Sequence, residues 1–222
     1  MNPSDLFSDP KTLALVKAAQ RGDVAGIRDA VHAGADPNAF GKDNATPLMA
    51  VLASTTNKDG LRGLLSVGAN PNLPSTDGVL PIELAARAPD PEFLRIMLAG
   101  GGNPNIHAGG GKPLLYLAAV DDRWENVQQL LDSGADINGK DESGYTTVMG
   151  MAKLRRFDRV AWFIDKGADV RIEADTGVNL ATVIYLTPPA PPAQEAWRPK
   201  VLQMLAQRGI NGPQQPNPQP SR

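Results

Sequence analysis

The chain has 222 residues, of which 41% are hydrophobic, 21% charged and 5% aromatic, and its formal net charge is −2. So small a net charge creates no broad positive field for phosphate backbones, and we therefore expect no binding of nucleic acid. There is no cysteine, which excludes disulfides, thiolate metal sites and cysteine nucleophiles.

A five-residue phrase recurs along the chain at intervals of 34, 33, 33 and 33 residues. It reads GADPN at 34–38, GANPN at 68–72, GGNPN at 101–105, GADIN at 134–138 and GADVR at 167–171. A unit of this length is one supersecondary element, which cannot bury its apolar face alone. The period therefore predicts a single continuous domain in which successive copies stack as a solenoid.

Each unit carries a second landmark ahead of its phrase. The landmark reads TPL at 46–48, LPI at 80–82, KPL at 112–114, TTV at 146–148 and NLA at 179–181. Proline in the first turn of a helix loses no hydrogen bond, so these sites are predicted to begin the inner helices. Gly134 and its equivalents supply the left-handed residue that ends the second helix, and the Asp or Asn of each phrase favours a turn. Each unit is thus predicted to contain a hairpin, a helix, a turn and a second helix.

The segments DESGYTTV at 141–148 and GADIN at 134–138 resemble the ankyrin repeat. The resemblance covers roughly residues 12–211 and is to the small, divergent, bacterial type of this family. It implies an all-α chain with short β-hairpin loops, an ankyrin-repeat α-solenoid of about five to six repeats. The family's histidine after Thr-Pro-Leu is absent, and its hydrogen-bond network is expected to be missing, which predicts a softer array. The positions of this histidine are occupied here by Met49, Glu83, Leu115, Met149 and Thr182.

The register divides the chain into a leader at 1–11, one ankyrin-repeat domain at 12–211 and a tail at 212–222. The units are expected near 12–39, 40–73, 74–106, 107–140, 141–172 and 173–211. The first helix opens behind Asp9 and Pro10, a plausible cap for the end of the stack. A proline-rich insertion at 187–199 is predicted to form polyproline II and to project from the last unit. The tail is rich in Pro, Gln and Asn, a composition typical of disorder.

No constellation of catalytic residues emerges. The two histidines, His32 and His107, are expected far apart, with no nucleophile beside either. The run Gly109–Lys112 is followed by Pro113 where a phosphate-binding loop needs Ser or Thr. The acidic residues at 121, 122 and 125 suit a solvated helix start better than a metal site. We therefore predict a protein that is not an enzyme and has no cofactor, no metal and no small-molecule substrate.

The resemblance implies that partner proteins bind along the hairpin tips and the exposed side of the inner helices. Aromatic residues at solvent-facing tips give the fold no advantage, which favours Phe40 and Tyr145 as contacts. Trp197 lies in the insertion, where a contact anchor and local packing are equally open. The expected partner-binding residues are Arg21, Phe40, Lys42, Asp43, Thr76, Asp77, Arg87, Val120, Asp121, Glu142, Ser143, Tyr145, Lys153, Asp175, Thr176 and Trp197.

The sequence therefore predicts a non-enzymatic protein–protein interaction module that sequesters or inhibits a specific partner, in the manner of an immunity protein for a toxin or enzyme. A scaffold or host-directed adaptor, linking two proteins without inhibition, is the alternative. No export signal or apolar run of about 18 residues is evident, which predicts a cytoplasmic protein without membrane insertion. A periplasmic protein that has lost its export signal would share this sequence, so that alternative stays open.

Overall fold

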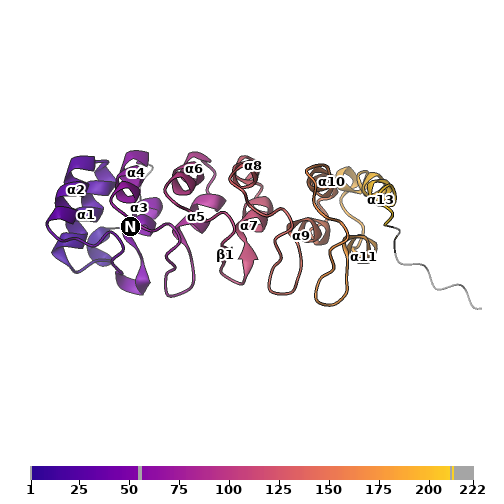
Figure 1. Cartoon of the computed structure of the whole chain (residues 1–222), viewed down its shortest axis with the longest axis horizontal. Helices are drawn as coiled ribbons and strands as arrows, with labels where there is room; N and C mark the ends of the chain where they lie inside the picture. The colour runs from indigo at the N-terminus through magenta and orange to yellow at the C-terminus, as the bar shows by residue number, and fades with distance from the viewer. Residues whose placement is uncertain (1, 55–56, 211, 213–222) are drawn as a thin grey trace, which may run out of the picture. The chain divides into compact units, whose positions relative to one another are not determined.

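The computed structural model describes residues 2–54, 57–210 and 212, and the chain divides into two compact units, Met1–Ala135 and Asp136–Arg222. The tail expected at 212–222 lies, apart from Gly212, outside the described residues. Each unit is a series of antiparallel helix pairs in which an inner helix is followed by an outer one (Figure 1). Within the described part of the chain, no helix is both long and apolar enough to span a membrane.

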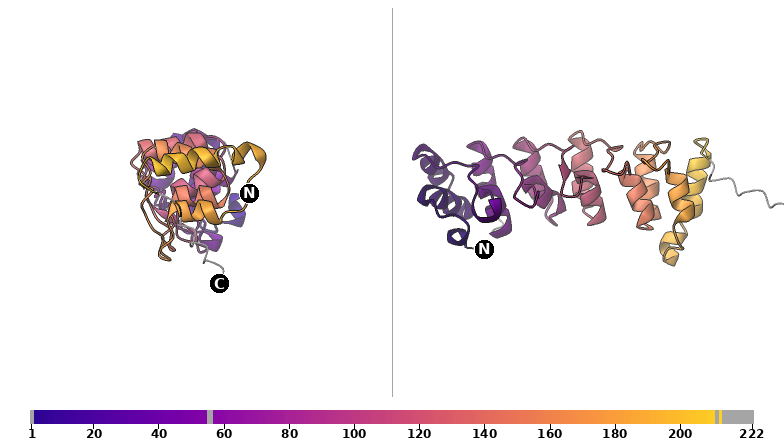
Figure 2. Two further views of the ribbon diagram at one scale, coloured as in Figure 1. Left: turned by 90° about the vertical axis from the view of Figure 1, so that its right-hand side faces the viewer. Right: turned by 90° about the horizontal axis from the view of Figure 1, so that it is seen from below.

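The first unit contains four helix pairs. They are α1 (Pro10–Arg21) with α2 (Val24–His32), α3 (Pro47–Ser54) with α4 (Lys58–Ser66), α5 (Pro81–Arg87) with α6 (Glu92–Ala99), and α7 (Leu114–Val120) with α8 (Trp124–Asp132). Inner helices contact inner helices and outer helices contact outer ones, which places the two kinds in separate rows (Figure 2).

The second unit repeats this pattern around α9 (Thr147–Lys153) with α10 (Phe157–Asp165), and α11 (Leu180–Leu186) with α13 (Arg198–Ala206). A short helix, α12 (Pro192–Glu195), lies between the last two and contacts α10 and α13. The six helix pairs of the described residues agree with the five to six repeats predicted from the period.

The ends of the helices follow from local chemistry that the sequence displays. Helix α1 is capped by Asp9, whose carboxylate accepts a hydrogen bond from the backbone N–H of Thr12 at 2.7 Å. Helices α3 and α5 begin at Pro47 and Pro81, as predicted, because proline lacks an N–H that the first turn would leave unpaired. Behind α8, Gly134 has a positive φ of 86°, the left-handed conformation expected of the residue that ends the helix.

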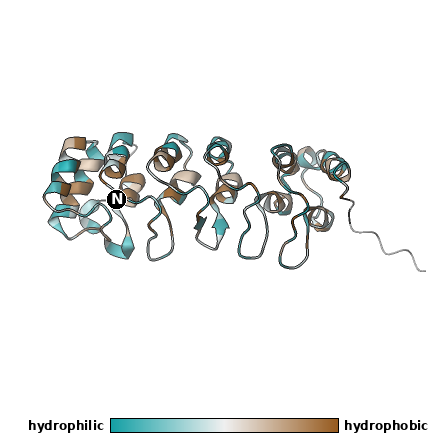
Figure 3. Ribbon diagram, in the orientation of Figure 1, coloured by the Kyte–Doolittle hydropathy of each residue, from teal (hydrophilic) through white to brown (hydrophobic). Residues whose placement is uncertain are grey.

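The core of each unit lies between the two rows of helices. In the first unit the fully buried side chains include Leu15, Ile27, Leu61 and Leu94, and in the second Phe157 and Phe163. The helices show hydrophobic and hydrophilic residues on different faces (Figure 3), the pattern of elements that bury one stripe against their neighbours. Stacking of these thin layers, rather than one large central core, therefore holds each unit together.

The Asp or Asn of each repeated phrase forms the predicted turn. Its side-chain oxygen accepts a hydrogen bond from the backbone N–H two residues later, at 2.8 to 2.9 Å in each of the five repeats that contain the phrase. Such a bond fixes the turn locally and needs no other part of the fold. The five pairs are Asp36 with Asn38, Asn70 with Asn72, Asn103 with Asn105, Asp136 with Asn138, and Asp169 with Arg171.

The asparagine that closes each of the first four phrases links one repeat to the next, which was not predicted from the sequence. Asn72 is typical: its side-chain amide donates to the carbonyl of Gly101 at 2.9 Å, and its Oδ1 accepts from the N–H of Asn103 at 2.9 Å. The same bonds join Asn38 to Gly68 and Asn70, Asn105 to Gly134, and, in the second unit, Asn138 to Asp169. We call these bonds the asparagine ladder.

The loops between helix pairs contain less regular β-structure than the prediction of hairpins implied. One two-stranded hairpin forms, β1 (His107–Ala108) with β2 (Lys112–Pro113). Two other loops are closed by single antiparallel bridges, Lys140 with Thr146 and Glu173 with Asn179. The loop of the first unit at Lys42–Asn44 instead forms a 3-10 turn, η2, with Asp43 in the left-handed region.

The N-terminal segment expected as a leader at 1–11 is in contact with the first repeat. It contains a 3-10 turn, η1 (Pro3–Asp5), and helix α1 begins within it, at Pro10. Phe7 is buried, and the carbonyl of Leu6 accepts a hydrogen bond from the N–H of Lys42 at 2.7 Å. Among the described residues, this segment therefore packs against α1 and the loop that leads into α3.

The proline-rich insertion is mostly exposed, and the expectation of polyproline II is wrong from Pro192 onward, where α12 begins. The guanidinium of Arg198 donates to the carbonyls of Ile184, Thr187 and Pro188 at 2.8 to 3.0 Å. Arg198 also forms an ion pair with Glu195 at 2.8 Å. Proline at the first position suits a helix start, and Arg198 satisfies carbonyls that α11 leaves unpaired at its end.

Candidate protein-binding surface

In the first unit, the C-terminal ends of the inner helices carry polar residues that pair with the equivalent position of the next repeat. The amide of Gln20 donates to the hydroxyl of Ser54 at 2.6 Å, and Nε of Arg87 donates to the carboxylate of Asp121 at 2.7 Å. The members of each pair are 34 residues apart. Of the predicted residues, the structure thus brings Arg87 and Asp121 together; Arg21 is exposed and lies near Asp23, at 4.0 Å.

Arg87 is held between two carboxylates. Besides Asp121, it lies 3.6 Å from Glu83, one turn earlier on α5. The hydrogen bond to Asp121 raises the pKa of Arg87 and so favours its charged form. Glu83 occupies the family's histidine position and is buried, with one carboxylate oxygen that no described residue hydrogen-bonds.

In the second unit, Lys153 lies over the ring of Tyr145, with its Nζ 3.8 Å from the ring centroid. Tyr145, predicted as a solvent-facing aromatic contact, is half-buried, whereas Lys153 is exposed. The cation covers the face of the ring and is attracted by its quadrupole. The structure therefore joins these two predicted residues into one contact and offers the lysine, more than the tyrosine, to a partner.

The hairpin tips are tied to one another through the backbone. The N–H of Thr76 donates to the carbonyl of Asp43 at 3.4 Å in the first unit, and the N–H of Asp175 donates to the carbonyl of Ser143 at 3.2 Å in the second. Backbone pairing leaves the tip side chains free to point into solvent. The exposed ones are Lys42, Asp43, Thr76, Asp77, Glu142, Ser143, Asp175 and Thr176.

Phe40 lies beside the predicted tip residue Lys42, whereas Trp197 lies apart, in the insertion. Phe40 is 53% exposed and lines a cleft of about 490 Å³ between the N-terminal segment and the first loop. Trp197 is 37% exposed and precedes α13, an outer helix, with the Nζ of Lys200 4.4 Å from its ring centroid. Val120 is half-buried at the end of α7.

Two exposed apolar residues at the end of α11 were not predicted. Tyr185 is 53% and Leu186 74% exposed. The signal was present in the sequence, because Leu186 follows Lys153 by one period of 33 residues. The sequence instead suggested Trp197, in the proline-rich insertion that follows, as the contact residue.

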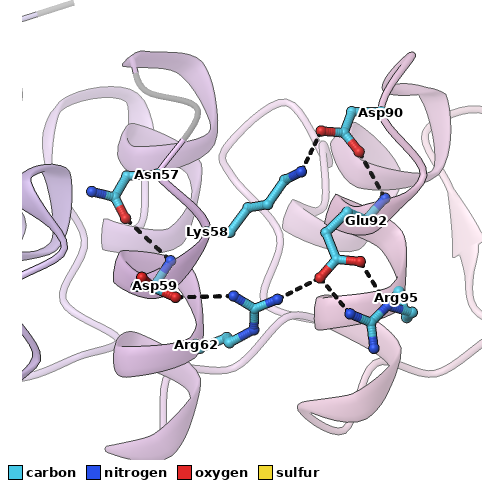
Figure 4. A network of polar contacts seen from close by, with 7 residues as sticks. All are labelled: Asn57, Lys58, Asp59, Arg62, Asp90, Glu92 and Arg95. Carbon is cyan, nitrogen blue, oxygen red and sulfur yellow. Dashed lines mark hydrogen bonds and ion pairs between the residues drawn. The ribbon is translucent and has the colours of Figure 1, made fainter.

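The outer helices of the first unit carry a polar network that includes none of the predicted partner-binding residues (Figure 4). Lys58 forms an ion pair with Asp90 at 2.7 Å, and Nε of Arg95 donates to Glu92 at 2.7 Å. Arg62 bridges Asp59 and Glu92, and so links α4 to α6. The hydrogen bond from Lys58 lowers the pKa of Asp90, and the one from Arg95 lowers the pKa of Glu92.

We expect this network to make stability depend on pH in the acid range. A carboxyl group whose pKa is lowered by folding stabilises the protein above its ordinary pKa of about 4, and this contribution is lost as the pH falls through the lowered value. Thermal unfolding midpoints of the wild type should fall more steeply between about pH 4 and pH 2 than those of Glu92→Gln. Superimposable pH profiles of the two proteins would contradict this assignment.

Comparison with known proteins identifies the fold. No protein-family model matches the sequence, and no curated protein matches it. The crystal structure of EF0377, described as an ankyrin repeat protein, aligns with a TM-score of 0.68 and 24% identity over 88% of this chain and 98% of that one. The ankyrin repeat domain of Bcl-3, described as a unique member of the IkappaB protein family, aligns with a TM-score of 0.72 and 22% identity over 89% and 86%.

The chain therefore has the ankyrin repeat fold, an all-α repeat solenoid with short loops. This confirms the resemblance that the phrases at 134–138 and 141–148 indicated.

Proposed function

We propose that the chain is a protein-binding module whose contact surface comprises the ends of the inner helices and the hairpin tips. The observation that carries this proposal is the position of the exposed large apolar side chains. Of the six among the described residues, five lie on inner helices or on the segments next to them, and the sixth is Trp197. They are Phe40, Leu84, Leu154, Tyr185 and Leu186. Exposed apolar residues gathered on one kind of element are typical of interaction sites.

The charges of the same surface support this assignment. Lys42, Asp77 and Glu142 are exposed at tips whose backbone is already paired, so their side chains contribute little to the fold. Charged side chains in such places set the rate and specificity of association with a partner of complementary charge. A backbone held by hydrogen bonds below exposed side chains is also favourable for binding, because little ordering is required of the chain.

For the partner, we propose a protein that is sequestered or inhibited, such as a toxin or an enzyme, with the inner-helix ends covering its working surface. An adaptor function is the alternative, and one observation favours it. The two compact units each carry their own tips and helix ends, so each has the elements to contact a different protein.

Exchange of charge at two tips tests the proposed surface. Lys42→Glu combined with Asp77→Lys keeps the net charge and should weaken the affinity for a partner captured from the native organism at least about tenfold. Arg28→Glu combined with Asp29→Lys on outer helix α2 is the matched control, because both residues are exposed there. Equal loss in both double variants would contradict the proposal. The partner's own activity in the complex then separates inhibition from an adaptor function.

A further inference from the structure

Three exposed apolar side chains lie at the ends of two neighbouring inner helices of the second unit. Leu154 follows α9 and is 41% exposed, and Tyr185 and Leu186, at the end of α11, are 53% and 74% exposed. Helices α9 and α11 pack against each other, and Arg155 next to Leu154 donates to the carbonyl of Pro189 at 3.2 Å. We call Leu154, Tyr185 and Leu186 the terminal apolar patch.

The fold gives no reason for this patch. Helix α11 already buries its other face through Leu180, Ala181, Val183 and Ile184. It is also the last inner helix among the described residues, and terminal repeats of such arrays ordinarily present a polar outer face for solubility. A leucine that is three-quarters exposed at this place favours a surface that another molecule covers.

The charges beside the patch are positive. Lys153 and Arg155 flank Leu154, and both are exposed. The carboxylates of the adjoining segments are each ion-paired with an arginine, Asp158 with Arg159 at 3.4 Å and Glu195 with Arg198 at 2.8 Å. The free charge around the patch is therefore cationic, and a covering segment with acidic residues would complement it.

We propose that the terminal apolar patch binds a segment of another protein in which a large apolar residue is flanked by aspartate or glutamate. The apolar residue would cover Leu186 and Tyr185, and the carboxylates would pair with Lys153 and Arg155. This inference rests on the proposed function and specifies the chemistry of the partner. An anchor residue in an apolar contact with charged groups at its rim is the arrangement that carries most binding energy in protein interfaces.

The chain's own C-terminal segment fits this site less well. Gly212 lies so close to the ring of Tyr185 that a Cβ atom there would overlap it, which places Gly212 at the edge of the patch; residues 213–222 come after it in the sequence. Their sequence, PQQPNPQPSR, contains no acidic residue, and its one charged side chain is Arg222. An arginine does not complement Lys153 and Arg155, so charge favours a different protein as the occupant.

Selection from a displayed library of random peptides tests the chemistry directly. The full-length chain is used as bait, and enriched peptides are titrated by fluorescence anisotropy. We expect an aromatic or aliphatic residue flanked by Asp or Glu, and affinities that fall severalfold when the salt concentration is raised, because the charged contacts are exposed. Peptides without acidic residues, or no enrichment at all, would overturn the proposal.

The variant Leu186→Glu removes the most exposed member of the patch. It also adds a negative charge, which should repel an acidic peptide. Binding of the selected peptides should fall at least about tenfold, whereas Ala25→Glu on outer helix α2, an exposed position outside the proposed surface, should leave it unchanged. Circular dichroism checks that both variants fold, and Leu186→Ser replaces Leu186→Glu if the latter does not. Equal binding to the wild type and the folded Leu186 variant would overturn the proposal.

Three further outcomes would show that the inference is wrong. The first separates it from the proposed function, and the other two identify a different occupant of the patch. If Leu186→Glu retains a protein partner that the exchange of tip charges releases, the proposed function stands and the patch is not its site. If Leu186→Glu converts a dimer into a monomer in sedimentation, the occupant is a second copy of the chain. If peptides bind only after truncation at Gly212, the occupant is the chain's own C-terminal segment. Each of these outcomes would overturn the proposal.

Discussion

Replacement of Asn126 by aspartate is expected to lower the free energy of unfolding by about 3 kcal/mol. Asn126 is a buried residue of α8 whose side-chain amide donates to the carbonyls of Ala86 and Ala88, at 2.9 and 3.1 Å. These carbonyls lie at the end of α5, where the helix has no partner of its own for them. Aspartate has the same shape but no amide donor, and it places a carboxylate against carbonyl oxygens in a buried site.

Urea denaturation followed by circular dichroism measures this effect. Asn126→Leu removes the donor without adding a charge and should be less damaging than Asn126→Asp, because only the unpaired carbonyls remain. Glu125→Gln, at the exposed neighbouring position, should change stability by less than about 0.5 kcal/mol. A denaturation midpoint of Asn126→Asp equal to that of the wild type would show that α5 does not depend on this amide.

The sequence predicted those parts of the fold that depend on contacts close along the chain or one period apart. The start of α5 at Pro81 and the left-handed Gly134 follow from the conformational limits of single residues. The pairing of Arg87 with Asp121 joins residues 34 apart, which the repeat register places next to each other.

Contacts outside the period were not predictable in this way. The side-chain amide of Asn126, on outer helix α8, donates to the carbonyl of Ala86, 40 residues earlier on inner helix α5 of the preceding repeat. No local sequence pattern indicates this contact. In the insertion, the four prolines at 188, 189, 191 and 192 suggested an extended segment. The fold is decided there by Arg198, whose contacts with carbonyls of the preceding helix end cannot be read from composition.

For the candidate surface too, features set by the repeat register were predictable and features set by other contacts were not. Register alone placed the tip residues, because their exposure depends only on their position in the repeat. The environment of Tyr145 was not predictable, since the position of Lys153 over its ring depends on how the loop and α9 meet. The sequence also suggested weakness where the family's histidine is missing, but the asparagine ladder supplies hydrogen bonds between repeats from the closing asparagine of the phrase, for which no role was predicted.

Removal of the asparagine ladder from the first unit is expected to destabilise that unit more than any single substitution. The variant changes Asn38, Asn72 and Asn105 to alanine. Each of the three donates to the carbonyl of the glycine in the next phrase at 2.9 Å. Each repeat in such an array is stabilised mainly by its neighbours, so loss of a bond at every junction weakens the whole series. With roughly 1 to 1.5 kcal/mol for each asparagine, the expected loss is about 4 kcal/mol.

Single variants and a conservative exchange distinguish the ladder from a general loss of polar surface. Asn72→Asp keeps the oxygen that accepts from Asn103 but loses the amide that donates to Gly101, so it should cost about half as much as Asn72→Ala. The three alanine substitutions lie in different repeats, and their effects should add. Hydrogen exchange of the amide of Asn103 should accelerate in Asn72→Ala and stay slow in Asn72→Asp, because aspartate preserves its acceptor. Equal exchange rates in the two variants would mean that the asparagine side chain does not hold the repeats together.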